Sequence, residues 1–223
     1  MTIKIVFVHH PGGESYALRF IQSYNENPPG ADHESIVVLN GLKETTEIQC
    51  LFSSLRNVRF LERDNSGADV GAYQEVARKF PAEMMAFFGT STYFKGPGWL
   101  LRMATAFCKY GDTLYGTTAN RGSGSIQPHI RTTGFFLSPS LFNQYPIRVT
   151  DTGRHGPRYE FEHGKTGLTS WVKARRLSPL VVSWNGIYRE EDWDNVPNGY
   201  HNGNQSALLC GDRLTENPYW GVP

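Results

Sequence analysis

The stretch RDNSGADVGAY, from Arg63 to Tyr73, gathers in one short loop the residue types that can bind a sugar nucleotide. Its two glycines leave the backbone open to close approach by a base, a ribose or a diphosphate. Its short polar side chains can accept hydrogen bonds from ribose or sugar hydroxyls. The glycines are Gly67 and Gly71, and the acceptors are Asp64, Asn65 and Asp69. A tight turn with an Asp cap on the following helix would use the same residues, and spacing alone leaves both interpretations open.

This loop lies between a predicted strand and a predicted helix, the place where loops bind ligands in open parallel sheets. Strand-like and helix-like segments alternate through the first half of the chain. The predicted strands cover residues 3–8, 36–39, 57–61, 84–89 and 113–118, and the predicted helices cover residues 15–24, 44–55, 71–80 and 99–110. The alternation predicts an α/β fold with a mainly parallel central sheet and helices on both faces.

The pattern changes after Arg121. HIRTTGFFLS predicts a strand, and a helix near residues 166–175 and a short strand at 180–183 follow it. The remaining residues are rich in Asn, Gly, Tyr and Trp and read as loops. We find no internal repeat and no linker, so we expect a single domain over residues 1–223.

Composition argues against several classes of partner. The chain has 22 Lys and Arg residues against 21 Asp and Glu residues, so no global field favours nucleic acid or an anionic membrane. The short cluster of Lys173, Arg175 and Arg176 closes a predicted helix, where cations interact favourably with the helix dipole.

Three scattered cysteines without CxxC spacing predict neither a zinc site nor a disulfide framework and fit a reducing cytosol. The first residues predict a strand instead of a targeting segment, and no apolar stretch predicts a transmembrane segment.

The motif N-x-G-x-D-x-G-A-Y, from Asn65 to Tyr73, resembles the donor-site loop of glycosyltransferases of the rhamnan-synthesis protein F type, in the wider GT-A group. Two companion segments follow in the same order. Such enzymes end the next strand in N-x-S-x-Y-G-P, where this chain has GTSTYFKGP over residues 89–97. A strand that begins at a His follows as HIRTTGFFLSPSLF over residues 129–142. The resemblance extends over residues 3–176.

This resemblance implies a single GT-A-like, Rossmann-like domain. It implies a cytoplasmic, inverting glycosyltransferase that moves a hexose or deoxyhexose from a nucleotide-sugar donor to a glycan or polysaccharide acceptor. Residues 1–120 would form the nucleotide-sugar-binding half, and residues 121–223 the acceptor-binding half and the C-terminal tail. Ser91, in the first companion segment, joins the expected donor site.

One departure from the GT-A pattern concerns the metal. Most GT-A enzymes place Asp-x-Asp at the end of the strand that is MMAFFG here, residues 84–89, to hold a divalent cation, Mn²⁺ or Mg²⁺, against the diphosphate. This chain has Gly89, Thr90 and Ser91 at that place. Either another group holds the ion, with Asp69 the best candidate, or positive side chains replace it. The side chains placed to do so are Lys95, Arg121, His129 and Arg131, which could equally be ordinary surface charges. We therefore expect weak dependence on a divalent cation at most.

The second constellation is YEFEHGKTGLTSW, residues 159–171. Glu162 and His163 resemble the x-E-D motif at the start of a GT-A helix, with His in place of the usual Asp. The resemblance implies that Glu162 is the base that takes the proton of the acceptor hydroxyl. Glu160 is the rival, because it would share the face of Glu162 if the segment were extended, and His163 could orient either carboxylate. Two carboxylates that favour a helix dipole would give the same pattern without catalysis.

The C-terminal tail has the aromatic and amide side chains that stack on sugars and bond their hydroxyls. His201, between two glycines, could reach the diphosphate, as C-terminal histidines do in several GT-A enzymes. A tail that only wraps the surface is an equal alternative, with Trp184, Trp193 and Trp220 as core anchors. The rival function is a non-catalytic nucleotide- or glycan-binding protein on the same scaffold. A Rossmann oxidoreductase fits less well, because HHPGGE after the first strand lacks the glycine spacing of a dinucleotide site.

Overall fold

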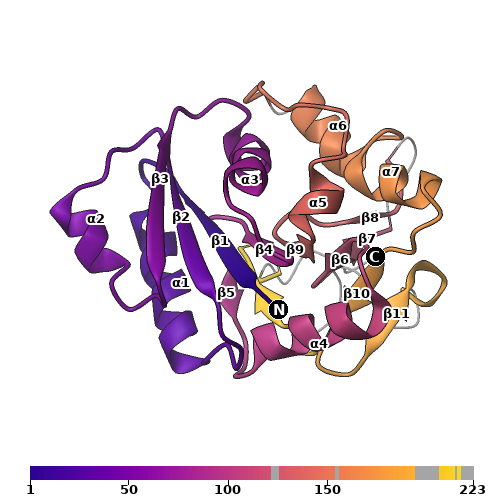
Figure 1. Cartoon of the computed structure of the whole chain (residues 1–223), viewed down its shortest axis with the longest axis horizontal. Helices are drawn as coiled ribbons and strands as arrows, with labels where there is room; N and C mark the ends of the chain where they lie inside the picture. Colours follow the sequence, from indigo (N-terminus) through magenta and orange to yellow (C-terminus); the bar gives the residue numbers. More distant parts are fainter. Residues whose placement is uncertain (122–125, 154–155, 194–205, 214, 217–223) are drawn as a thin grey trace.

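A mostly parallel sheet of eight strands forms the centre of the computed structural model, which describes residues 1–121, 126–153, 156–193, 206–213 and 215–216. In spatial order its strands are β11 (Ile187–Arg189), β10 (Leu180–Val182), β6 (Tyr115–Gly116), β9 (Gly134–Leu137), β4 (Met84–Phe88), β1 (Ile3–His9), β2 (Glu34–Asn40) and β3 (Val58–Arg63) (Figure 1). Within these described residues, only β9 and β11 run antiparallel to their neighbours in the sheet. Two short pairs lie beside the sheet: β5 (Tyr93–Phe94) with β12 (Cys210–Gly211), and β7 (Ala119–Asn120) with β8 (His129–Ile130).

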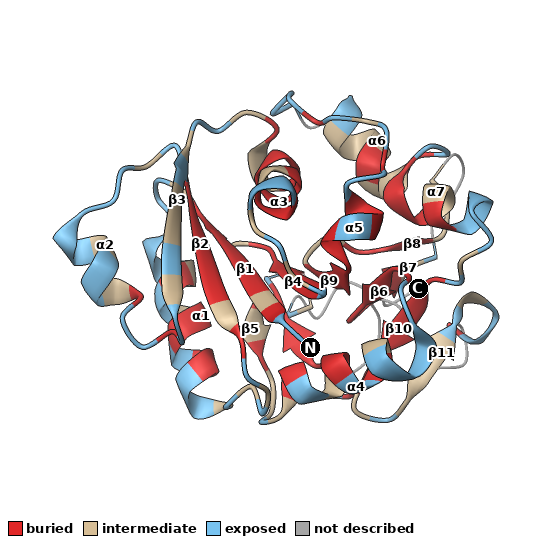
Figure 2. Ribbon diagram, viewed as in Figure 1, coloured by how far each residue is buried: buried red, intermediate tan, exposed pale blue. Residues whose placement is uncertain are grey.

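Alternate residues of each central strand pack into two separate hydrophobic cores. In β1, Ile5 and Phe7 belong to one core, and Val6 and Val8 belong to the other. All four side chains are buried, which explains why this strand is a continuous apolar run instead of an alternating one (Figure 2). The sheet is therefore covered on both faces.

The helices divide between these two faces. One core includes side chains of α1 (Glu14–Glu26) and α4 (Trp99–Tyr110), with α2 (Thr46–Leu51) at its margin. The other core includes side chains of α3 (Ala68–Lys79), α5 (Pro139–Phe142), α6 (Pro157–His163) and α7 (Leu168–Ala174). A 3-10 turn, η1 (Glu190–Asp192), follows β11. The predicted α/β fold is confirmed, and no helix in the described ranges is long and apolar enough to cross a membrane.

The structure differs from the sequence prediction mainly after Arg121. HIRTTGFFLS is not one strand: β8 pairs with β7 outside the main sheet, and β9 enters the sheet between β4 and β6. The segment around Tyr159, which the comparison of Glu160 with Glu162 considered as extended, is helix α6; it begins at Pro157, a residue favoured in the first helical turn. Trp193 is fully buried and Trp184 packs against the first core, as the anchor interpretation expects, whereas Trp220 lies outside the described residues.

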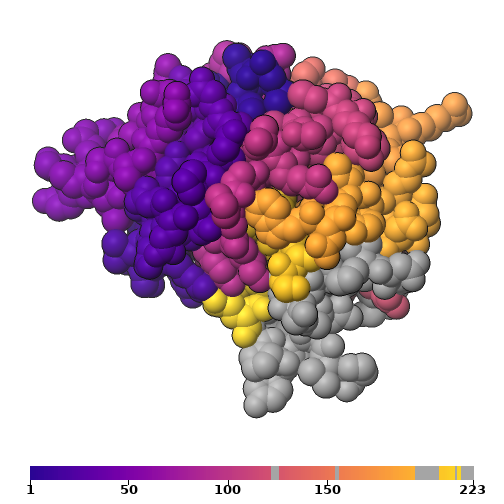
Figure 3. All heavy atoms as spheres, turned by 90° about the horizontal axis from the view of Figure 1, so that it is seen from below, coloured from indigo at the N-terminus to yellow at the C-terminus, as the bar shows by residue number. Residues whose placement is uncertain are grey.

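The last described segment returns to the first half of the chain. β12 pairs with β5, and Arg19 of α1 forms an ion pair with Glu216. In Figure 3 this yellow segment lies beside the indigo and magenta parts of the surface, far from it in sequence. The pairing fixes the position of Asp212, which follows β12 directly.

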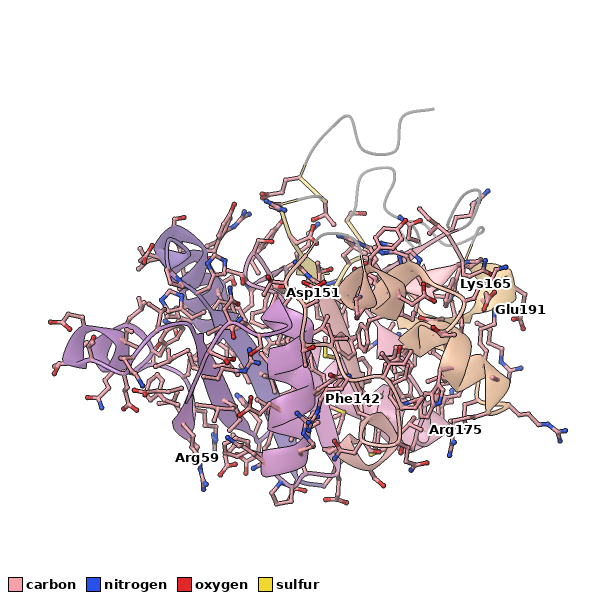
Figure 4. All side chains as sticks on the ribbon, turned by 90° about the horizontal axis from the view of Figure 1, so that it is seen from above. Arg59, Phe142, Asp151, Lys165, Arg175 and Glu191 are labelled. Carbon is pink, nitrogen blue, oxygen red and sulfur yellow. The ribbon has the colours of Figure 1, made fainter. Side chains whose placement is uncertain are left out.

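Helix α3 begins against the segment that precedes α6. Gly67, its N-cap, has φ +69° and donates its N–H to the carbonyl of Thr150 at 2.9 Å. A side-chain Cβ at Gly67 would lie 2.1 Å from the carbonyl oxygen of Val149. Figure 4 shows Asp151, the next residue of that segment, beside α3, with Phe142 of α5 below it. The glycine is therefore required for both its backbone angle and the close contact.

Gly67→Ala should destabilise the protein more than Gly98→Ala does. Gly98 is a matched control, because it caps α4 with φ +81° and a Cβ there would meet nothing within 4 Å. We expect Gly98→Ala to lower the free energy of unfolding by about 1 to 2 kcal/mol through the left-handed backbone alone. Gly67→Ala should lose about 1 to 3 kcal/mol more through overpacking. Urea denaturation measures both, and equal losses would contradict the close contact with Val149.

Candidate active site

A cavity of about 590 Å³ opens beyond the carboxyl ends of β1, β2 and β4. The order of the sheet reverses between β1 and β4, since the crossover from β1 leads to β2 on the opposite side. Ligands of open α/β sheets bind at such a switch point. The cavity is lined from the sheet by His10, Asn40, Asn65, Thr90 and Ser91, and from the other side by His129, Arg131, Arg158, Glu162, His163 and Asp212.

Only some of the ligand-binding residues predicted in the loop after β3 line the cavity. Asn65 and Asp69 line the cavity, and the side chain of Asn65 accepts a hydrogen bond from Asn40 at 2.6 Å. Asp64 is turned to solvent, with 80% of its side chain exposed, and its carboxylate accepts from the N–H of Ser66 at 3.0 Å. Asp64 therefore forms the tight turn, which was the alternative interpretation of this loop.

The two glycines of this loop serve packing and do not line the cavity. The carbonyl oxygen of Val149 fills the space beside Gly67, and a Cβ at Gly71 would lie 2.3 Å from the carbonyl oxygen of Ser66. The sequence analysis expected both glycines to let a ligand approach the backbone. This expectation is wrong, because the protein's own backbone occupies that space.

Asp69 is held by an arginine that the sequence analysis did not single out. Its Oδ1 lies 3.1 Å from Nη2 of Arg158, in α6. Burial raises the pKa of the Asp69 carboxyl, Arg158 lowers it, and the nearby charge of Glu162 raises it again. An Asp engaged by Arg158 is a poor candidate for the metal ligand that the sequence analysis considered.

Glu162 and two histidines form a cluster on the cavity wall. Oε1 of Glu162 accepts the N–H of Thr132 at 3.1 Å, and Oε2 lies 4.0 Å from Nε2 of His163. The rings of His129 and His163 meet edge to face, with their centroids 4.6 Å apart. Burial lowers the pKa of His129. One ligand atom from each of the three residues lies within 4.8 Å of the others, a spacing that a metal ion could use.

Glu160 points away from this cluster. Its Oε1 accepts hydrogen bonds from the N–H and the hydroxyl of Thr166, at 2.9 and 2.8 Å, and these bonds lower the pKa of its carboxyl. Both glutamates belong to α6, in which residues two apart face different sides. The idea that Glu160 shares the face of Glu162 is wrong for this reason. Glu162 also lies near the end of α6 and does not open a helix.

Arg131 and Asp212 form a buried ion pair at the cavity. Nη2 of Arg131 lies 3.0 Å from Oδ2 of Asp212, and their side chains are 6% and 3% exposed. Oδ1 of Asp212 also accepts the N–H of Thr215 at 2.8 Å. Nη1 of Arg131 is buried and has no hydrogen-bond partner among the described residues. One donor edge of a fixed guanidinium is therefore available to a ligand.

The remaining sequence candidates divide into three groups. Ser91, His129 and Arg131 line the cavity as expected. Lys95 and Arg121 do not line it: the N–H of Lys95 donates to the carbonyl of Leu209 at 3.1 Å, and Arg121 borders a separate hollow with Lys173 and Arg176. His201 lies outside the described residues.

Arg158 and Asp212 are two charged cavity residues that sequence reasoning missed. Each stands in a segment without a motif, and only the fold brings it to the site. At the usual Asp-x-Asp place, the hydroxyl of Thr90 donates to the carbonyl of Val8 at 3.1 Å, and Gly89 to Ser91 include no carboxylate. The residues at this place do not fit a metal ion.

No known protein family and no curated protein matches the sequence. Among solved structures, residues 1–349 of S. aureus TarS match with a TM-score of 0.52 and 14% identity, over 72% of this chain and 54% of the fragment. The same fragment in complex with UDP matches with a TM-score of 0.53 and 15% identity, over the same 72% and 54%. The chain has the GT-A fold. It spans about half the length of the TarS fragment, and at these identities the likeness concerns the fold alone.

Asp212→Asn should destabilise the GT-A domain strongly, because it leaves the buried guanidinium of Arg131 without its counter-charge. We expect the free energy of unfolding to fall by about 3 to 5 kcal/mol. Lys43→Gln is the control, since it breaks an ion pair of 2.7 Å to Glu62 in which Lys43 is 82% exposed, and it should cost less than about 1 kcal/mol. Similar losses in urea denaturation of the two variants would contradict the buried pair.

Proposed function

We propose that this chain is a glycosyltransferase of the rhamnan-synthesis protein F type, which transfers a hexose or deoxyhexose from a nucleotide-sugar donor to a glycan or polysaccharide acceptor. The observation that carries the proposal is the buried Arg131, whose Nη1 has no hydrogen-bond partner within the described ranges and which lines a cavity at the switch point of a GT-A sheet. The bound UDP of the TarS fragment supports a nucleotide diphosphate as the ligand class.

Each part of the donor has a matching group in the cavity. A guanidinium binds phosphate oxygens through a planar fork of donors, so Arg131 is the proposed anchor of the diphosphate. Asn65 and Asp69 offer oxygens to ribose or sugar hydroxyls, and Ser91 offers a hydroxyl beside them. Asp212 keeps the guanidinium in place through its ion pair.

Glu162 is the carboxylate that we assign to the transfer. Of the three carboxylates that line the cavity, Asp69 and Asp212 are held by Arg158 and Arg131, whereas Glu162 accepts the backbone N–H of Thr132. A carboxylate in this place can take the proton of an acceptor hydroxyl, as an inverting transfer requires, or it can hold a cation. Either use makes its charge essential.

The second candidate function is a non-catalytic nucleotide- or glycan-binding protein. The absence of carboxylates at Gly89 to Ser91 favours it, since most GT-A enzymes hold their cation there. Slow release of free sugar from a nucleotide sugar separates the two functions, because a transferase also transfers to water and a binding protein does not.

The donor assignment predicts that Arg131→Lys weakens binding of nucleotide sugars. Lys keeps the positive charge but loses the fork of donors, so we expect Kd for the UDP-sugar bound best to rise about tenfold, equivalent to about 1.4 kcal/mol. Isothermal titration calorimetry measures this, with circular dichroism to show that the fold is kept. Unchanged affinity in Arg131→Lys would remove Arg131 from the donor site, and absence of binding by the parent to any nucleotide sugar would refute the proposed function.

The role of Glu162 predicts a contrast between two glutamates of one helix. Glu162→Gln should lower the rate of transfer, or of donor hydrolysis, by about 10² to 10⁴, because the amide is neither a proton acceptor nor an anion. Glu160→Gln is the control and should retain the parent rate, since Glu160 bonds Thr166 outside the cavity. Full activity of Glu162→Gln would move the assignment to another carboxylate.

A further inference from the structure

Backbone hydrogen bonds hold the side chains of His129, Glu162 and His163 in place. Nδ1 of His129 lies 2.7 Å from the carbonyl of Gln127, and Nδ1 of His163 lies 3.2 Å from the carbonyl of Tyr159. A carbonyl can only accept a hydrogen bond, so in each ring Nδ1 carries the proton and donates. Nε2 of each ring is then the atom that can bind a cation, because imidazole binds metal ions in its neutral form.

The third group of the cluster is the carboxylate of Glu162. The N–H of Thr132 holds Oε1 of Glu162, while Oε2 lies 4.0 Å from Nε2 of His163, too far for a hydrogen bond. One ligand atom from each residue lies within 4.8 Å of the others, and all three side chains line the cavity. A positive ion can bind two imidazoles and a carboxylate at the same time.

We propose that His129, Glu162 and His163 bind a divalent cation, and that the ion is of the class that imidazole prefers, with Zn²⁺ favoured over Mg²⁺. Two imidazoles and one carboxylate are a ligand set of catalytic Zn²⁺ sites, which keep a further position open for a substrate oxygen. The carbonyls of Gln127 and Tyr159 supply the outer hydrogen bonds that orient metal-binding histidines. Ligand atoms of a tetrahedral Zn²⁺ site lie roughly 3.3 Å apart, so small side-chain rotations would close the set.

From the missing Asp-x-Asp we expected a weak dependence on a divalent cation at most. The proposed site predicts instead that the protein binds such an ion. It also gives Glu162 the cation-holding role in preference to that of a free base. The ion would supply positive charge to the leaving diphosphate, and this part of the inference rests on the proposed function. The ion site itself does not, because the ligand geometry is independent of any donor.

Calorimetric titration of the untagged protein with Zn²⁺, after treatment with a chelator, tests the site. We expect one ion per chain and a higher melting temperature with Zn²⁺ than with Mg²⁺. His129→Gln, His163→Gln and Glu162→Gln should each weaken binding by about 100-fold or more, since loss of an outer partner alone costs about 10- to 100-fold. His163 is only part-buried, so its variant should fold even if His129→Gln does not.

Two controls separate this site from unspecific binding. His10→Gln removes another imidazole of the cavity, and Glu160→Gln removes another carboxylate of α6; both should keep the parent affinity. No ion bound by the parent, or parent affinity in His163→Gln, would overturn the inference. Titration with UDP-sugars in chelator runs in parallel. Donor binding without any ion binding would overturn the ion site and keep the proposed function. Ion binding without donor binding would keep the ion site and refute the proposed function.

Discussion

The parallel pairing of β1 with both β2 and β4 is the constraint on which the rest of this structure depends. Backbone hydrogen bonds hold the three strands side by side, with their carboxyl ends at one edge. The crossover helix after β1 packs into one core, and α3, which leads into β4, packs into the other. The loops at this edge diverge as a result, and the cavity opens between them.

The cavity is organised by charges that are paired before any ligand arrives. Arg131 is fixed by Asp212, and Asp69 is fixed by Arg158. Ion pairs of this kind contribute less to stability than to a defined geometry, because removing charges from water offsets much of their attraction. A guanidinium held in place can meet phosphate oxygens without first losing its own freedom of motion. In our proposal, the site is therefore organised in advance for an anionic ligand.

The second half of the chain provides the wall of the cavity that lies opposite the sheet edge. β8 and α6 bring two imidazoles and a carboxylate to the wall opposite β4, and β12 returns Asp212 from the far end of the chain. The edge itself provides hydroxyl and amide groups, without the carboxylates that most GT-A enzymes place there. In our interpretation, the cation function has moved from the sheet edge to the opposite wall.

The sequence alone determined the fold class. Short apolar runs and helical spacing are local signals, and they predicted β1 to β4 and the helices between them. The sequence also indicated Glu162, His129 and Arg131 as site candidates, and all three line the cavity. Only the tertiary structure decided that Gly67 packs on Val149, that Glu160 faces Thr166, and that Arg158 and Asp212 enter the cavity. These outcomes depend on contacts between segments far apart in the chain, whose free energy comes from packing and charge pairing that no local pattern records.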